Sequence, residues 1–138
     1  MIKSSLDFEN DLYGLLRDYL PTAIEGCTLY KKGCRPLDSC STDAVVNVST
    51  ADAGQIQAGR VHLNVYVPDI DNDSGTLVPD KARLTAIAGL GDEIVDYLNL
   101  CTTNEYLFHL YQAPQEYEEP DIRQHFVDFP IEFERITF

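Results

Sequence analysis

Positive charge is scarce in this sequence. Its 138 residues include 10 Lys and Arg against 23 Asp and Glu, so the formal net charge at pH 7 is −13. Binding to nucleic acid through its phosphates, or to an anionic membrane surface, requires clustered Lys and Arg side chains. We therefore expect neither kind of binding, and the excess of carboxylates favours solubility.

Long apolar runs are missing as well. Hydrophobic residues make up 44% of the chain, but no stretch approaches the ~20 consecutive apolar residues of a membrane-spanning helix. The first residues, Met1 to Asp7, lack the apolar core of a signal peptide. We expect a protein that stays in the compartment where it is made, with residues 1–138 forming a single domain.

Recognisable catalytic motifs are also absent. The sequence has no G-x-S-x-G nucleophile turn, no glycine-rich phosphate loop and no H-E-x-x-H zinc motif. His62, His109 and His125 each lie in a strand-like pattern, and spacing gives none of them an Asp or Ser partner. We expect structural or surface histidines, no cofactor, and a protein that is not an enzyme.

The four cysteines lack the spacing of a zinc site. Cys27, Cys34 and Cys40 are separated by six and five residues, whereas a zinc knuckle has the C-x-x-C spacing. We expect reduced thiols instead of a metal site. Cys101 follows an apolar helical pattern and is predicted to be a small buried side chain.

An alternating run of acids, DIDND, follows one of the strand patterns. An EF-hand calcium loop needs Gly at its sixth position for the turn and Glu at its twelfth as a bidentate ligand. Ser74 and Asp80 occupy those positions here. Asp69, Asp71 and Asp73 are therefore weak metal candidates, and the sequence favours a solvated acidic loop without a bound ion.

Two helices are predicted from apolar residues at three- and four-residue steps. The first runs from Ser4 to Leu20, with Asp7 completing its cap and Pro21 ending it. The second runs from Asp80 to Leu98 and carries one apolar stripe that is wide enough to cover a sheet. Its positions are Leu84, Ile87, Ala88, Gly91, Ile94, Val95 and Leu98.

Strands are predicted where apolar residues alternate or cluster. They run from Thr28 to Tyr30, Ala44 to Ser49, Arg60 to Val67, Tyr106 to Tyr111 and His125 to Ile136. In the last of these, Pro130 removes one backbone donor and favours a sheet edge or a bulge. The residues predicted to form the centre of the core are Leu63, Val65, Ile87, Ile94, Phe129 and Ile131.

Two segments lack a clear pattern. Ala51 to Gly59 is too long for a tight turn, so it is either a flexible loop or the projecting end of a long hairpin. Ala113 to Asp121 contains two prolines and an acidic run, and is predicted as a solvated loop. The element order α-β-β-β-α-β-β then predicts an α+β fold, a mainly antiparallel sheet with two helices packed on one face.

This layout resembles the small α+β proteins that terminate or complete the tails of long-tailed bacteriophages, including the minor tail proteins of prophages. The resemblance rests on an N-terminal helix, a strand pair, a second helix and two closing strands. These are Asp7 to Leu20, Ala44 to Val48 with Gly59 to Val67, Lys81 to Leu98, and Tyr106 to Tyr111 with Phe126 to Phe138. The segment Cys27 to Cys40 has no counterpart in this layout.

The resemblance implies a virion structural protein that forms a homo-oligomeric ring, commonly a hexamer, at the tail end or head–tail junction. Its partners are then the tail tube or connector proteins, and DNA passes through the ring without specific binding. Such a protein is found in the bacterial cytoplasm during assembly and afterwards in the virion tail. We assign the interface to Gln55, Ile56 and Gln57 in the predicted hairpin and to the aromatic chain end, Phe138.

Two other functional classes stay open at this point. One is a small soluble enzyme or ligand-binding domain with its pocket between helix and sheet, near His62 or His109. The other is a regulatory interaction module of acidic character. A closed oligomer favours the ring, whereas a monomer with a deep pocket favours the enzyme or ligand-binding domain.

Overall fold

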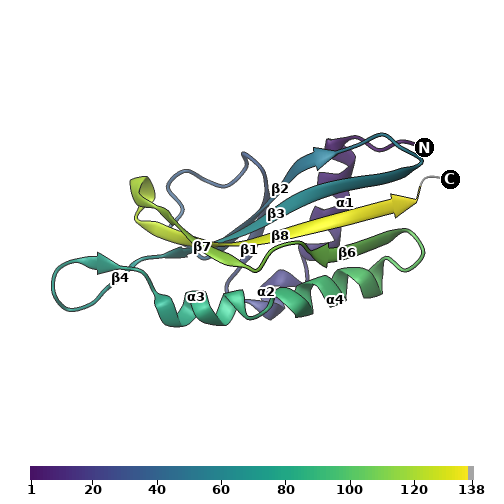
Figure 1. Cartoon of the computed structure of the whole chain (residues 1–138). Helices are drawn as coiled ribbons and strands as arrows, with labels where there is room; N and C mark the ends of the chain where they lie inside the picture. The colour runs from purple at the N-terminus through teal and green to yellow at the C-terminus, as the bar shows by residue number, and fades with distance from the viewer. Residues whose placement is uncertain (137–138) are drawn as a thin grey trace.

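The two longest strands form the centre of the sheet (Figure 1). The computed structural model describes residues 1–136. β3 (Ile56–Pro68) and β8 (Gln124–Ile136) are antiparallel and pair along their whole length, from Ile56 opposite Ile136 to Pro68 opposite Gln124. The last strand of the chain therefore completes the middle of the sheet.

The other strands extend the sheet on both sides of this pair. β2 (Asp43–Ala51) is antiparallel to β3, and β1 (Thr28–Lys31) lies parallel to β2 at one edge. On the far side, β6 (Tyr106–Leu110) and β7 (Gln115–Glu119) both pair antiparallel with β8, at different parts of its length. The predicted mainly antiparallel sheet is thus confirmed.

The three longer helices pack on one face of this sheet. They are α1 (Ser5–Leu16), α3 (Lys81–Ala88) and α4 (Gly91–Cys101), and Figure 1 shows α3 and α4 end to end along the sheet. Phe8 of α1 contacts Phe133 of β8, with ring centroids 4.7 Å apart. The predicted α+β class is confirmed. Within residues 1–136, no helix has the length and apolarity needed to cross a membrane.

Alternate residues of the central strands face the helices and form the core. The six residues predicted for the centre of the core are all buried, with at most 3% of their surface exposed. They are Leu63, Val65, Ile87, Ile94, Phe129 and Ile131. The period of two in the strands and the helical stripe therefore identified the buried faces correctly.

The first helix begins as predicted and ends earlier. Ser4 Oγ accepts a hydrogen bond from the Asp7 N–H (3.1 Å), while the Asp7 carboxylate accepts one from the Ser4 N–H (2.8 Å). The helix stops at Leu16, and a separate short helix, α2 (Leu20–Ala23), follows with Pro21 in its first turn. Proline fits there because the first turn of a helix leaves its N–H groups unpaired.

The predicted helix from Asp80 to Leu98 is interrupted near its middle. α3 ends before Gly89 and α4 begins at Gly91, and each glycine disfavours a continuous helix by about 1 kcal/mol relative to alanine. Leu84 and Ile87 before the break, and Ile94 and Leu98 after it, are all buried. The apolar stripe therefore continues across two helices.

Residues 51–59 form the end of a long hairpin, the second of the two predicted alternatives. β2 continues to Ala51, with a register shift between Val48 and Thr50, and β3 begins at Ile56. Gly59 is required within β3 because a Cβ there would lie 2.5 Å from Cζ of Phe133. The aromatic ring of β8 thus packs directly over the backbone of β3.

The segment predicted as a solvated loop, Ala113 to Asp121, contains a strand. β7 pairs with the first half of β8, and a 3-10 turn (Pro120–Ile122, η1) leads back into β8. Four residues of β7 are exposed and the fifth is half-buried. The strand was missed because neither of its faces is apolar, so no period of two is present.

Pro130 lies in a central strand, so the predicted edge position is wrong. β8 is flanked by β3 on one side and by β6 and β7 on the other. The Pro130 C=O accepts a hydrogen bond from the Tyr111 N–H (3.1 Å), which follows the end of β6. In an antiparallel strand, the N–H and C=O of one residue point to the same side. The missing donor of Pro130 therefore faces the gap between β6 and β7.

We predict that Ile94→Ala lowers the free energy of unfolding by about 2–5 kcal/mol, because shortening a fully buried side chain leaves a cavity in the core. Urea denaturation measures the loss. Leu100→Ala on the same helix is the matched control, since Leu100 is 77% exposed, and its effect should stay within about 0.5 kcal/mol. Equal effects of the two substitutions would show that the buried face of α4 is wrongly assigned.

Candidate functional site

Polar and aromatic side chains gather on the face of the sheet opposite the helices. Within residues 1–136, no helix covers it. Its central strands contribute the residues that alternate with the core positions, and most are half-buried. They include Val45, Asn47, His62, Asn64, Tyr66, Phe126, Asp128 and Glu132. We call this surface the open face.

A hydrogen-bonded chain of three side chains lies at the centre of the open face. His62 Nδ1 is 3.0 Å from Asp128 Oδ1, and His62 Nε2 is 3.1 Å from the Tyr111 hydroxyl oxygen. A carboxylate oxygen accepts, so the Nδ1–H of His62 donates a hydrogen bond to Asp128, and the other ring nitrogen, Nε2, accepts one from the Tyr111 hydroxyl. The chain joins β3, β8 and the residue that follows β6.

Charged side chains surround this chain. The Arg60 guanidinium lies 4.3 Å from the ring centroid of Tyr111 and pairs with Glu132 (3.2 Å). Glu132 is also 3.6 Å from Nε2 of His109, on β6. Sequence spacing gave these histidines no Asp or Ser partner, but the folded sheet gives each an acidic one: Asp128 for His62, and Glu132 for His109. His125 has Asp69, 2.7 Å from its Nδ1.

A row of three aromatic rings crosses the open face near the end of β3 and the start of β8. Tyr66, Phe126 and Tyr117 lie side by side on β3, β8 and β7, with centroid distances of 5.0 and 5.4 Å. The Arg35 guanidinium covers the first ring at 4.4 Å. Burial raises the pKa of Tyr66, Glu119 raises it further, and Arg35 opposes them, so the phenol stays protonated at neutral pH.

The loop between β1 and β2 folds over this end of the open face. Arg35 donates to the carboxylate of Asp43 (3.1 Å) and to Oε1 of Gln124 (2.8 Å), and Gln124 donates to the Ser39 C=O (2.8 Å). Both Asp43 and Gln124 are buried. The segment from Cys27 to Cys40, which the tail-protein layout does not explain, thus positions the arginine that covers the aromatic row.

The end of the β2–β3 hairpin, which was predicted as an interface, contains both exposed and buried residues. Gln55 is exposed, and Ile56 is 57% exposed directly opposite Ile136, which is 48% exposed. Leu107 of β6 is 58% exposed and lies on the same face, opposite Glu134. Together Ile56, Ile136 and Leu107 form an apolar patch at this end of the open face, which we call the end patch. Phe138 lies outside the described residues.

Gln57 does not belong to the exposed surface, so its side chain cannot provide the predicted contact. It is fully buried. Its amide donates to the C=O groups of Lys3 (2.9 Å) and Asp52 (2.7 Å), and its Oε1 accepts from the Lys3 N–H (2.9 Å). Arg135 lies beside it and donates to the Met1 C=O (3.0 Å). Gln57 therefore fastens the N-terminal segment to the sheet.

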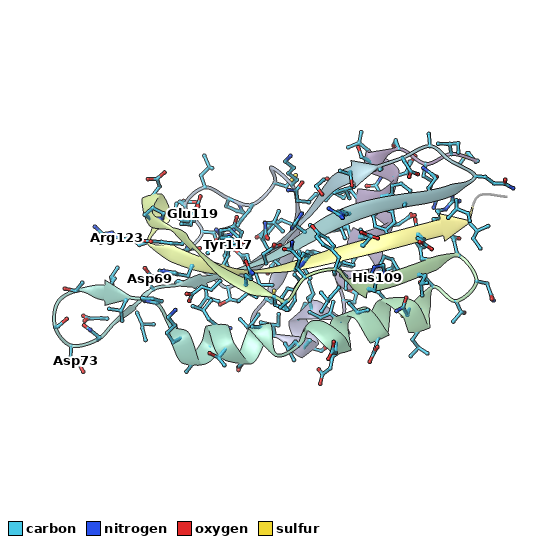
Figure 2. All side chains as sticks on the ribbon, in the orientation of Figure 1. Asp69, Asp73, His109, Tyr117, Glu119 and Arg123 are labelled. Atoms are coloured by element: carbon cyan, nitrogen blue, oxygen red, sulfur yellow. The ribbon has the colours of Figure 1, made fainter. Side chains whose placement is uncertain are left out.

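The acidic segment forms a two-stranded arm, and its tip, residues 72–76, is an exposed loop as predicted. β4 (Ile70–Asp71) pairs with β5 (Leu77–Val78), and Figure 2 shows Asp73 near the tip and Asp69 near the base. Asp69 pairs with His125, and Asp71 accepts from the Asp73 N–H (2.9 Å). Within residues 1–136, no group of three or more His, Cys, Asp or Glu side chains is arranged to hold a metal ion.

A groove on the helix side is the nearest equivalent of the predicted pocket between helix and sheet. It is lined by Asn10, Asp11, Gly14, Leu15, Cys101, Thr102, Thr103, Glu105 and Tyr106. His62 and His109 are not among these residues because both lie on the open face, so the predicted placement of a pocket near them is wrong. Burial and the adjacent Asp11 raise the pKa of Tyr106 well above its ordinary value, and its hydroxyl donates to Asp11.

The cysteines are divided between core and surface. Cys27 is buried, and this burial raises its pKa to about 11. Cys34, Cys40 and Cys101 are exposed. The prediction of a buried Cys101 is therefore wrong, because this residue ends α4 on its outer side.

Comparison with protein-family models and with curated proteins gives no relative. No protein-family model matches the sequence, and no curated protein matches it. The features of the molecule that bear on function are therefore the open face, the edges of the sheet and the two hairpins.

We predict that Asp128→Ala lowers the free energy of unfolding by about 1–3 kcal/mol, because the ring N–H of His62 loses its acceptor in a half-buried position. Glu134→Ala is the matched control on the same strand, since Glu134 is exposed. Chemical denaturation of both variants measures the difference. If both lose the same amount, the chain of hydrogen bonds does not stabilise the sheet.

A second prediction concerns the thiols. With a pKa of about 11 and little exposed surface, Cys27 should react with iodoacetamide much more slowly at neutral pH than the three exposed cysteines, since the thiolate is the reactive form. Mass spectrometry of the native and the urea-unfolded protein gives the comparison. Rapid modification of Cys27 in the native protein would contradict this placement.

Proposed function

We propose that the protein is a non-catalytic structural subunit of a phage or prophage particle, which assembles into a homo-oligomeric ring at the tail end or head–tail junction in a tail-terminator or completion role. The observation that carries the proposal is the end patch, on a sheet face that no helix of residues 1–136 covers. Apolar side chains that stay exposed together in this way mark a contact site.

The edges of the sheet also support a repeating contact. β1 at one edge and β6 at the other each leave one side unpaired by the strands of residues 1–136. When a contact joins different surfaces of identical subunits and closes on itself, the product is a ring. Two hairpins, β2–β3 and the β4–β5 arm, extend at opposite ends of the molecule in Figure 1 and lengthen the surface that a neighbour can contact.

The net charge of −13 is compatible with a channel for DNA. A surface rich in carboxylates does not neutralise phosphates and therefore does not hold the DNA that passes it. The same charge opposes close association of identical subunits. Apolar contacts such as those of the end patch are the kind that offset this repulsion.

We predict that Ile56→Asp prevents ring assembly while the monomer stays folded. The substitution places a carboxylate in the proposed contact, and burying an unpaired charge costs several kcal/mol. Size-exclusion chromatography with light scattering measures the mass as a multiple of 15.5 kDa. The tail tube is added when the protein alone is monomeric, and tail completion is then scored by electron microscopy and infectivity.

Leu37→Asp is the matched control, because Leu37 is 95% exposed in the loop before β2. It makes the same kind of change away from the end patch and should leave assembly intact. Deleting residues 55–58 is a poorer test, since it removes the buried Gln57 and so disturbs folding. Normal assembly and infectivity of the Ile56→Asp protein would exclude the end patch as the contact, and intact particles without the gene would exclude the tail role.

A further inference from the structure

β7 presents an unpaired strand edge to solvent. Its residues Gln115–Glu119 pair with β8, and no other strand within residues 1–136 pairs with them. Alternate residues of an antiparallel strand turn their backbone N–H and C=O groups to opposite sides, so about half of these groups in β7 face away from β8. An exposed edge of this kind is a template for a further strand.

The side chains along this edge are acidic. Glu116 forms an ion pair with Lys81, while Glu118 and Glu119 form none with the described residues. Figure 2 shows Glu119 and Tyr117 on this strand, and Arg123 in the turn beyond it. Charged side chains, lysine above all, commonly protect an edge strand from further pairing, and the carboxylates of β7 leave this edge open to a strand that brings positive charge.

The aromatic row ends at the same edge. Arg35 covers the first ring of the row, and Phe126 packs on one side of the last ring, Tyr117, with the two planes 24° apart. Tyr117 is 43% exposed, and no cation of the described residues lies over its ring. A guanidinium or ammonium group placed there gains the cation–π attraction that Arg35 gains at Tyr66.

We propose that the outer edge of β7 binds an extended, basic segment of another protein by strand addition. The backbone of β7 supplies the hydrogen bonds, Glu118 and Glu119 pair with Lys or Arg side chains, and the exposed ring of Tyr117 takes one of these cations. Affinity then comes from main-chain pairing and specificity from the alternating side chains. This inference does not depend on the ring, because it concerns a different edge from the end patch and a different partner.

The basic segment comes from another protein because this chain has used most of its own positive charge. Most Lys and Arg side chains bond within the molecule, and only the side chains of Lys32 and Arg123 have no ion pair or hydrogen bond to the described residues. The engaged side chains are Lys3, Arg17, Lys31, Arg35, Arg60, Lys81, Arg83 and Arg135. Nucleic acid is excluded as the occupant because its phosphates are repelled by the same carboxylates.

Titration calorimetry with the full-length protein tests the proposal. The probes are a short blocked peptide of Arg-Arg-Val repeats, which places Arg on both faces of an added strand, the same peptide with Glu in place of Arg, and the Arg peptide with all of its backbone nitrogens methylated. We expect the Arg peptide to bind and the other two not to bind, because one lacks the charge and the other lacks the N–H groups for pairing.

The double variant Glu118→Lys, Glu119→Lys should bind the Arg peptide at least about tenfold more weakly. The matched control is Asp18→Lys, Asp96→Lys, which makes the same change of charge at exposed positions away from β7 and should bind as the unchanged protein does. Thermal melting first confirms that both variants are folded.

Three results would overturn the proposal. The first is that the Arg peptide does not bind. The second is that methylation leaves its binding unchanged, or that both double variants weaken it equally. Either form of the second result would show that the peptide is attracted by overall charge alone. The third is that the protein associates with itself and that the Glu118→Lys, Glu119→Lys variant does not. This result would assign the edge of β7 to a second copy of the chain.

Discussion

The pairing of β3 with β8 is the constraint on which the rest of the structure depends. Both strands are 13 residues long and pair from end to end. Every other strand of the main sheet attaches to one of these two, directly or through β2. A shift of one residue in this pairing would move each strand's apolar side chains to the opposite face, so the core and the open face are both set by this register.

The same pairing brings together residues that are distant in the chain. His62 and Asp128 meet because they lie on β3 and β8, and Tyr66 and Phe126 are direct cross-strand neighbours. Contacts of such long sequence separation form slowly during folding, because a long loop must close before they are made. The polar chain and the aromatic row of the open face are thus products of the completed sheet.

The distribution of charge links the two proposals. Positively charged side chains form contacts within the molecule. Arg35 holds the loop between β1 and β2 over the aromatic row, and Arg135 binds the N-terminal segment. The surface is left with an excess of carboxylates, which favours contacts that are apolar, as at the end patch, or that supply positive charge, as proposed for β7. The two contacts have different chemistry and different positions, so one chain is able to make both.

The sequence by itself determined the fold class, the buried faces and the cap of the first helix, because these follow from local periodicity and from residues three positions apart. It also indicated the long hairpin as one of two alternatives. Only the tertiary structure decided which strands are neighbours. The partners of His62, the burial of Gln57 and the central position of Pro130 all follow from that arrangement. β7 was missed for the same reason: with both faces exposed, its structure depends on hydrogen bonds to β8, and such pairing leaves no pattern in the sequence.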